Sequence, residues 1–276
     1  MKVFSIIQPS SFLPRRPQED YLFISKKYPI FTVADGVTLQ LKKGIEYPKV
    51  SGAAEVAEIL CKTVISEAEK RYDNFKESDL GEVFENSNKP LAGYNALHGR
   101  AKETINYFDV DFFSATTALM LVKNSKAYWC SLCDSGVIVL NKNGRRILSS
   151  PISPPDKGEF LPVGWKKMAE EKRAKVMHSY RNKIGPNGEL LGYGVADGEK
   201  GAVRYLNSGK IDLNEEDLIL VYTDGFEEYL KLGEFNKIFT EWPRDLKRRL
   251  DLLMTKMEKK SKKKYGLERS LIAIKI

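Results

Sequence analysis

Three short segments of the chain share one design, an aspartate closely followed by a glycine at the end of an apolar run. They are Val33-Ala34-Asp35-Gly36, Cys133-Asp134-Ser135-Gly136 and Tyr222-Thr223-Asp224-Gly225. A single Asp-Gly pair predicts only a turn. Three such carboxylates at strand ends can converge on Mg²⁺ or Mn²⁺, because these hard cations prefer oxygen ligands. The pattern therefore indicates a metal-dependent phosphate site.

A site that hydrolyses phosphate needs further charged groups. Two divalent ions bridged by an aspartate generate hydroxide at neutral pH and offset the charge that builds on a phosphoryl group. Such a site uses four or five acidic side chains and a cation that orients the phosphate. The first loop offers both kinds of group: Glu19 or Asp20 is a fourth carboxylate, and Arg15 or Arg16 is the cation.

The elements that position these groups follow from the hydrophobic periodicity. Apolar residues recur every three or four positions after Ser51, which makes Ser51 the predicted N-cap of a helix. Strands, then two helices, then strands again predict an α+β architecture of mainly antiparallel sheet. Residues 207–210 are interpreted as a turn. The expected strands are 3–7, 21–25, 30–34, 112–122, 127–132, 137–141, 202–206, 217–222 and 271–276, and the expected helices are 51–68, 80–97 and 244–263.

Residues 149–192 differ from the rest of the chain. They contain three closely spaced prolines, a charged helix-like piece at 166–175 and few apolar residues. A long segment of this kind predicts a surface flap over the body, of the sort that defines access to a substrate site. We find no internal repeat and no linker, so we expect a single domain over residues 1–276.

Composition excludes several classes of protein. The chain is 42% hydrophobic, which supports a packed core. No apolar run is long enough to span a membrane. Residues 1–10 lack the pattern of a secretion signal, so we expect a cytoplasmic protein. The three cysteines, Cys61, Cys130 and Cys133, fit a reducing compartment and are interpreted as small buried hydrophobes.

The net charge of +8 is unevenly distributed. Most of the basic excess lies after residue 241, and its densest part is Lys259-Lys260-Ser261-Lys262-Lys263-Lys264. A solvated helix end explains this run in the simplest way. The alternative is a surface on the basic 244–264 segment that binds phosphates of nucleic acid or of a membrane. No aromatic residues interleave the lysines, so nucleic acid is the less favoured partner.

The ordered motifs resemble the metal-dependent Ser/Thr protein phosphatases of type 2C, in their bacterial form. The likeness runs over almost the whole chain, with the family's order and spacing. Its matches are Arg15-x-x-x-Glu19-Asp20, Val33-Ala34-Asp35-Gly36, Ser114-Ala115-Thr116-Thr117-Ala118, Cys133-Asp134-Ser135-Gly136 and Leu218-Ile219-Leu220-Val221-Tyr222-Thr223-Asp224-Gly225-Phe226.

The resemblance implies a four-layer α-β-β-α sandwich, in which helix pairs flank a central β-sandwich. It implies two Mn²⁺ or Mg²⁺ ions, with a weaker third, and hydrolysis of phospho-Ser/Thr in proteins by metal-activated water. The implied partners are phosphoproteins and the Ser/Thr kinase that produces them. The implied roles are Asp35 as the bridge between the ions with the Gly36 carbonyl also coordinating, Glu19 on one ion, Asp224 on the other, Asp134 on the third, and Arg15 on the phosphate.

Two departures from the family pattern stand out. Some members carry a histidine after the first Asp-Gly as a general acid, whereas this chain continues Val37-Thr38-Leu39-Gln40. Near the C-terminus, Leu267 falls where the family has a metal-binding aspartate, and leucine cannot bind a cation. Either the longer side chain of Glu268 reaches the metal site, or Asp224 and water fill the gap. A second hypothesis is therefore a binding or scaffold protein of the same fold with little or no activity.

Overall fold

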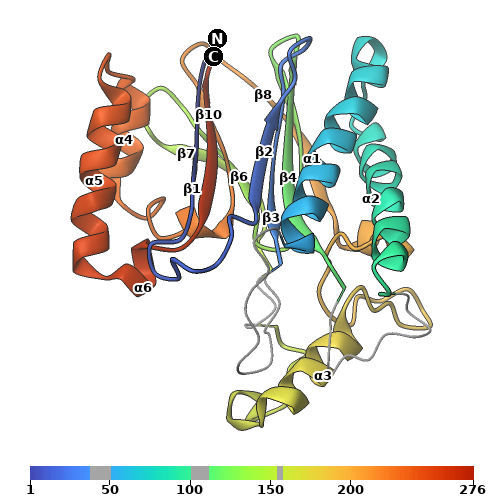
Figure 1. Cartoon of the computed structure of the whole chain (residues 1–276). Coiled ribbons are helices and arrows are strands. Elements are labelled where there is room, and N and C mark those ends of the chain that lie inside the picture. The colour runs from blue at the N-terminus through green and yellow to red at the C-terminus, as the bar shows by residue number, and fades with distance from the viewer. Residues whose placement is uncertain (38–50, 101–111, 154–157) are drawn as a thin grey trace.

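The strands form two antiparallel sheets that pack face to face (Figure 1). The structure is a computed structural model that describes residues 1–37, 51–100, 112–153 and 158–276. One sheet has the order β1-β10-β9-β6-β7 and the other the order β2-β3-β4-β5-β8. The strands are β1 (Lys2–Gln8), β2 (Asp20–Ile24), β3 (Ile30–Gly36), β4 (Ala115–Lys123), β5 (Lys126–Leu132), β6 (Gly136–Leu140), β7 (Arg146–Ser149), β8 (Asn207–Asp212), β9 (Leu218–Tyr222) and β10 (Arg269–Lys275).

Helices cover both outer faces of the sandwich and complete four layers (Figure 1). Helices α1 (Gly52–Arg71) and α2 (Asp79–Leu97) lie on the β2–β8 sheet, and α4 (Gly233–Glu241) and α5 (Leu246–Lys260) lie on the β1–β7 sheet. The predicted α-β-β-α sandwich with antiparallel sheets is confirmed. Helix α4 was not anticipated from the sequence.

Strand β9 packs against two hydrophobic cores, one on each face of its sheet. All five of its residues are buried. Leu218 and Leu220 belong to the core beneath α4 and α5, whereas Ile219 and Val221 belong to the core between the sheets. Successive side chains of a strand point to opposite faces. A strand buried on both faces therefore reads as a continuous hydrophobic segment rather than an alternating one.

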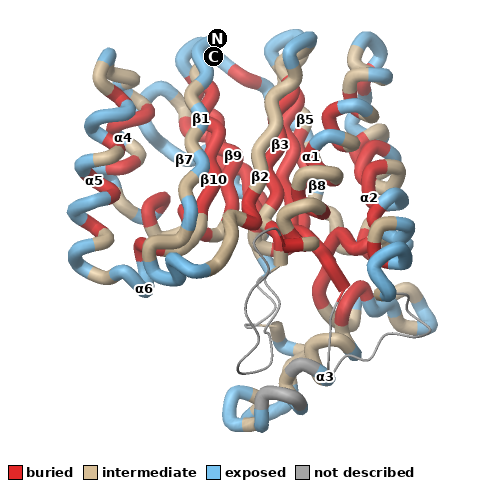
Figure 2. Tube along the Cα trace, in the orientation of Figure 1, coloured by how far each residue is buried: buried red, intermediate tan, exposed pale blue. Residues whose placement is uncertain are grey.

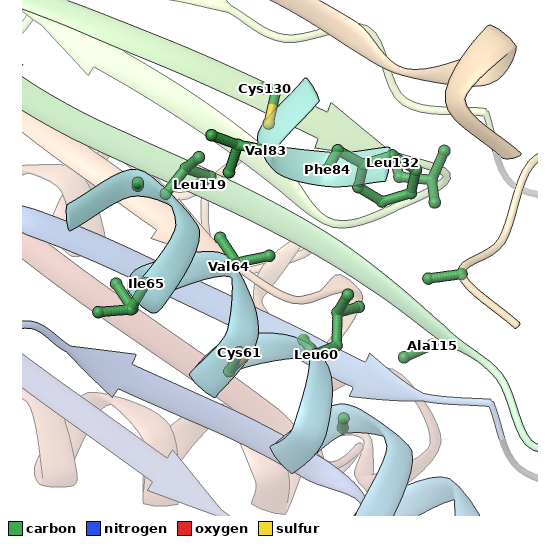
Figure 3. Close-up of a cluster of buried hydrophobic side chains, with 14 of the residues drawn as sticks. Leu60, Cys61, Val64, Ile65, Val83, Phe84, Ala115, Leu119, Cys130 and Leu132 are labelled. Atoms are coloured by element: carbon green, nitrogen blue, oxygen red, sulfur yellow. The ribbon is translucent and has the colours of Figure 1, made fainter. Parts of the chain in front are cut away.

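An N-cap fixes the start of helix α1, and packing fixes its buried face against the sheet. The Ser51 hydroxyl accepts a hydrogen bond from the Ala54 amide at 3.1 Å, so the predicted N-cap is confirmed. From there Leu60 and Val64 pack with Phe84 of α2 against Leu119, Cys130 and Leu132 of the sheet (Figure 3). The end of β3 lies directly against the start of α1, since a Cβ atom at Gly36 would lie 2.7 Å from the Ala53 carbonyl oxygen.

One predicted strand–turn pair is wrong. Residues Lys200–Tyr205 form a short 3-10 helix, and the expected turn at 207–210 is the start of β8. Strand β8 pairs along β5, with Gly209 opposite Trp129. A Cβ atom at 209 would lie 3.1 Å from the Trp129 ring, so glycine lets the strand pack closely there. Tertiary pairing thus overrides the turn preference of the Asn-Ser-Gly sequence.

The segment from 158 to 192 extends beyond the ends of the sheets and carries α3 (Glu170–Tyr180) (Figure 1). The Asn182 side-chain amide donates to the Val195 carbonyl at 3.0 Å and to Asp197 Oδ1 at 3.0 Å, which fixes its return to the body. Phe160 and Tyr180 pack near Val37 and Cys133. The predicted flap over 149–192 includes residues 154–157, which lie outside the described part, and its role stays a prediction.

The structure also bears on membrane-spanning helices and on the cysteines. Within the described residues, no helix combines the length and apolarity that crossing a membrane requires. Cys61, Cys130 and Cys133 are all buried and free, as predicted.

Candidate metal and phosphate site

Five carboxylate side chains come together at one end of the sandwich, and both sheets contribute. Asp20 of β2 and Asp35 of β3 are direct partners in the register of one sheet. Asp224 follows β9 and Glu268 precedes β10 in the other sheet, and Asp134 lies in the turn that crosses between the sheets. The charges of the other four all act on Asp35, and Asp20 and Asp224 are each acted on by Glu268 as well. The fold thus gathers residues that are far apart in the sequence.

The crossing turn that carries Asp134 is held in an uncommon backbone conformation. Cys133 has a φ of 66°, in the left-handed region, which costs a non-glycine residue roughly 1 to 2 kcal/mol. Its carbonyl accepts from the Ser153 amide at 2.7 Å, and the hydroxyls of Ser135 and Thr116 are 2.6 Å apart. These contacts, from the flap side and from β4, fix the turn that presents Asp134.

The glycines of the first and third aspartate motifs allow close approach of backbones. A Cβ atom at Gly36 would lie 2.7 Å from the carbonyl oxygen of Ala53 at the start of α1. A Cβ atom at Gly225 would lie 1.9 Å from the carbonyl oxygen of Glu268. The second contact is impossible, so Gly225 is what lets the turn after β9 lie directly against the segment before β10.

Asp20 is the more deeply placed member of the Glu19-Asp20 pair. It is buried, and its Oδ2 accepts from the Thr223 hydroxyl at 2.7 Å. The Ser270 amide in turn donates to that hydroxyl at 2.8 Å, so Thr223 ties the two sheets together. Burial raises the pKa of Asp20, and the charge of Glu268 raises it further. The resemblance assigned no metal role to Asp20, although the sequence offered it as an alternative.

The Glu19 carboxylate accepts a hydrogen bond from the Ser51 hydroxyl. Its backbone carbonyl accepts from the Gly36 amide at 3.2 Å. Glu19 is buried and its charge raises the pKa of Glu268, so it belongs to the rim of the acidic group. Glu19 therefore links the β2 entry, the Asp35-Gly36 turn and the start of α1.

Glu268, and not Leu267, reaches the other carboxylates. Its Oε1 accepts from the Gln18 side chain at 2.7 Å and from the backbone amides of Glu19 and Asp20. Burial raises the pKa of Glu268 to about 7, against the lowering effect of these amides. The Leu267 carbonyl accepts from the buried Arg269 guanidinium at 3.0 Å. A metal-binding role of Glu268 in place of the missing aspartate stays a prediction.

Asp35 and Asp224, from opposite sheets, form the centre of the acidic group. Burial raises the pKa of Asp35, and the charges of Asp20, Asp224 and Asp134 add to the effect. Burial, with the charge of Asp134, raises the pKa of Asp224 to about 7, while a hydrogen bond to the Asp35 carboxyl lowers it. Buried carboxylates that repel each other bind protons or cations to reduce that repulsion.

A divalent metal fits this donor set by its chemistry. In the described part of the chain, no three His, Cys, Asp or Glu side chains converge closely enough to hold an ion as they stand. The group nevertheless offers only oxygen donors, and the charges of Asp224, from the other sheet, and of Asp134 both raise the pKa of Asp35. Carboxylate oxygens are the ligands that hard cations such as Mg²⁺ and Mn²⁺ prefer, so the chemistry of the donor set fits such an ion.

The two arginines of the first loop differ in position. Arg15 is exposed, whereas Arg16 is partly buried and its charge lowers the pKa of Glu268. The structure thus brings Arg16 to the acidic group, and the phosphate role expected of Arg15 stays a prediction. Residues 38–40, the rest of the Val37-Thr38-Leu39-Gln40 departure, lie outside the described residues.

Comparison with known proteins gives a family match and fold neighbours. A family model described as protein phosphatase 2C matches residues 15–264. No curated protein sequence matches the chain significantly. Similar solved structures include the catalytic domain of the serine threonine protein phosphatase PstP in complex with two manganese ions, at 13% identity and a TM-score of 0.57, covering 99% of this chain and 96% of that one.

Two further structures show the same likeness. A bacterial serine phosphatase is 16% identical with a TM-score of 0.61, covering 100% of this chain and 98% of that one. PppA, described as a key regulatory component of T6SS in Pseudomonas aeruginosa, is 13% identical with a TM-score of 0.59, covering 100% of this chain and 97% of that one. At these identities the structural likeness shows the fold.

Proposed function

The chain belongs to the protein phosphatase 2C family, and from this premise we propose that it hydrolyses phosphoserine and phosphothreonine esters in proteins with two divalent metal ions. The enzyme class inferred from the motifs, protein Ser/Thr phosphatase, agrees with this family. The observation that carries the proposal is the gathering of carboxylates from both sheets around Asp35, whose pKa is raised by burial and by the charges of Asp20, Asp224, Asp134 and Glu268.

The carboxylates are proposed to divide the metal-binding work by position. Asp35, whose pKa is raised by the charges of Asp20 and Asp224, would hold both ions, and the Gly36 carbonyl would contribute a further ligand. Asp224 and Glu268, from the opposite sheet, would supply ligands as well, and Asp134 would hold a weaker third ion. Bound Mn²⁺ or Mg²⁺ would activate a water molecule and neutralise charge on the phosphoryl group.

The remaining residues are proposed to position the substrate and the ligands. Arg15, by resemblance, and Arg16, by its charge on Glu268, are candidates to hold the phosphate in a bidentate hydrogen-bonded pair. Thr223 holds the Asp20 carboxylate through its hydroxyl. The Glu19 carboxylate accepts a hydrogen bond from Ser51, the N-cap of α1, and is proposed to hold this edge of the acidic group against the helix.

The test is metal-dependent release of phosphate from phosphoserine and phosphothreonine peptides. We expect turnover with Mn²⁺ that disappears on chelation and falls by ~10³-fold or more in Asp35→Asn, since the metals contribute several kcal/mol. Asp212→Asn is the matched control, because it removes a carboxylate that is 81% exposed and pairs with Lys126 at the start of β5, whereas Asp134 follows the other end of that strand. Equal activity of Asp35→Asn and the wild type would exclude the proposal.

The second candidate is a phosphatase-fold binding protein with little or no activity. It is favoured by Leu267 at the expected ligand position and by the absence, within the described residues, of a preformed three-residue ligand set. Calorimetric titration with Mn²⁺ separates the two. Binding of two ions that Asp35→Asn abolishes supports the enzyme, whereas no heat of binding up to millimolar Mn²⁺ supports the binding protein.

We further propose a single phosphatase domain over residues 1–276, with a flap at about 149–192 that contributes to substrate choice. A cytoplasmic location agrees with three buried free cysteines, which need a reducing compartment to remain free when exposed during folding. Phosphoproteins are the proposed partners, together with the Ser/Thr kinase that supplies their phosphate.

A further inference from the structure

The loop between β1 and β2 carries a short exposed apolar tip. Phe12 is 40% exposed and Leu13 is 38% exposed, and Pro14 beside them is also exposed. Single exposed apolar residues are common on soluble proteins and need no explanation. Three consecutive ones at the end of a loop form a small apolar surface that water solvates poorly.

This tip is fixed in place against helix α6 (Lys262–Tyr265). The Phe12 amide donates to the Gly266 carbonyl at 2.9 Å, and the Ser10 hydroxyl donates to the same carbonyl at 3.0 Å. The Leu13 amide donates to the Ser10 hydroxyl at 2.9 Å. Figure 1 shows the loop beside α6, at the end of the molecule opposite the chain termini. The tip therefore has a defined position next to the lysine-rich run.

Four lysines beside the tip have no ion-pair partner among the described residues. Lys259, Lys260, Lys262 and Lys263 are all exposed, and the tube around α6 is coloured as exposed in Figure 2. Other lysines of the same region are paired, for example Lys264 with Glu228 at 2.7 Å. The position of the first two at the end of α5 is favoured by the helix dipole. The dipole explains why two of the lysines lie at a helix end. It does not pair any of the four with a carboxylate.

The carboxylate that directly precedes this run, Glu258, is already engaged. Glu258 accepts from the Arg269 guanidinium and, through its other oxygen, from the Ser11 hydroxyl at 3.1 Å. Arg269 is buried, so Glu258 serves that internal cation. The four lysines are therefore available to a negatively charged partner outside the chain.

We propose that this lysine–apolar surface, composed of Phe12–Pro14 with Lys259, Lys260, Lys262 and Lys263, docks the protein on an anionic lipid bilayer. An apolar tip among cations fits the headgroup boundary, where side chains such as Phe and Leu insert and lysines contact lipid phosphates. A nucleic-acid strand would instead call for several aromatic side chains for base stacking, and the tip has one. Charge complementarity and the tip together favour the bilayer.

Docking would bring the proposed phosphatase site close to the membrane. The same loop continues from the tip through Arg15 and Arg16 to Glu19, and the segment after α6 continues from Gly266 to Glu268. Phosphoproteins held at or in the membrane would then be the substrates within reach. The docking proposal itself does not depend on phosphatase activity, because binding is measured separately.

The experiment is co-sedimentation of the full chain with vesicles. We expect binding to vesicles with about 30 mol% phosphatidylglycerol, little binding to pure phosphatidylcholine, and weaker binding as salt rises from ~50 to ~200 mM. Each lysine near an anionic surface strengthens binding roughly fivefold. We expect Lys262→Glu with Lys263→Glu to lower the partition coefficient at least ~30-fold, and Phe12→Ser with Leu13→Ser about 10-fold.

Matched controls keep the result specific. Leu97→Ser removes an exposed leucine at the end of α2, 87% exposed, and Lys26→Glu with Lys27→Glu reverses two exposed lysines in the β2–β3 turn. Both controls should bind vesicles like the wild type. Equal losses in the controls, or equal binding to neutral and anionic vesicles, would refute the proposal. So would binding of a DNA oligonucleotide or an acidic peptide in the absence of vesicle binding.

Discussion

The acidic group and the lysine–apolar surface both gather charges of one sign, but in opposite settings. The five carboxylates lie at the end of the sandwich, where burial raises the pKa of Asp35, Asp224 and Glu268. The lysines lie in solvent on α5 and α6. Repulsion between buried charges acts strongly because water does not screen it, whereas salt and water screen repulsion between exposed ones. The charges of the carboxylates therefore depend strongly on one another. Each lysine is instead expected to contribute to binding independently of the others.

The two regions also differ in how the chain assembles them. The carboxylates come from five separate segments, including two sheets and the turn that joins them. The lysines come from one continuous run, and only the Phe12–Pro14 tip is brought to it from elsewhere. A substitution in the acidic group is therefore expected to change the pKa values and ligand positions of the other carboxylates. A substitution on the lysine–apolar surface is expected to remove one contact only.

The largest expected contrast comes from neutralising one member of each region. Asp224→Asn should abolish metal-dependent turnover, with a loss of ~10³-fold or more, because Asp224 is proposed to hold an ion on which catalysis depends. Lys262→Gln should weaken vesicle binding only about fivefold. Phosphate release and vesicle co-sedimentation measure the two effects. Comparable, small losses in both variants would show that the acidic group is not a coupled site.

The second prediction concerns the close approach at Gly225. Gly225→Ala should destabilise the fold by roughly 2 to 4 kcal/mol, because its methyl group would collide with the Glu268 backbone. Thermal unfolding monitored by circular dichroism gives the change. Gly233→Ala is the control, since a Cβ atom at that position has no neighbour within 4 Å. A tolerated Gly225→Ala would show that the segment before β10 can move away from the acidic group.

The third prediction is a dependence of metal-free stability on pH. The pKa values of Asp224 and Glu268 are raised to about 7, so between about pH 4 and about pH 7 the folded state binds more protons than the unfolded state. Stability should fall by roughly 2 to 4 kcal/mol as pH rises through this window. Denaturant unfolding with a chelator present measures it, and Asp224→Asn should flatten the profile. Mn²⁺ should restore stability at high pH.

The smallest predicted effect tests the loop that joins the two regions. Arg16→Ala should raise KM for a phosphopeptide about tenfold, as expected from losing one charge-assisted contact to phosphate. Arg15→Ala should raise it less, because Arg15 is exposed and Arg16 is the arginine whose charge reaches Glu268. Steady-state kinetics on the two variants compares them. A larger effect of Arg15→Ala would restore the assignment made by resemblance.

Local patterns in the chain were enough to predict most of the fold. The apolar runs at 30–34 and 217–222 and the Ser51 cap correspond to β3, β9 and α1, since strand alternation and helix capping depend on nearby residues. The pattern failed at 202–210, where pairing with β5 makes a strand of a turn-like sequence. It also missed α4, a short helix of nine residues between two loops.

The sequence by itself determined which residues could bind a metal and in which order they occur, because Asp-Gly at a strand end is a local feature. It also determined the basic run at 259–264. Only the tertiary structure decided that Asp20 faces Asp35, that Glu268 lies among the carboxylates beside Leu267, and that Phe12 lies against α6. These relations depend on sheet register and on contacts between segments more than 200 residues apart in the chain, which no local pattern encodes.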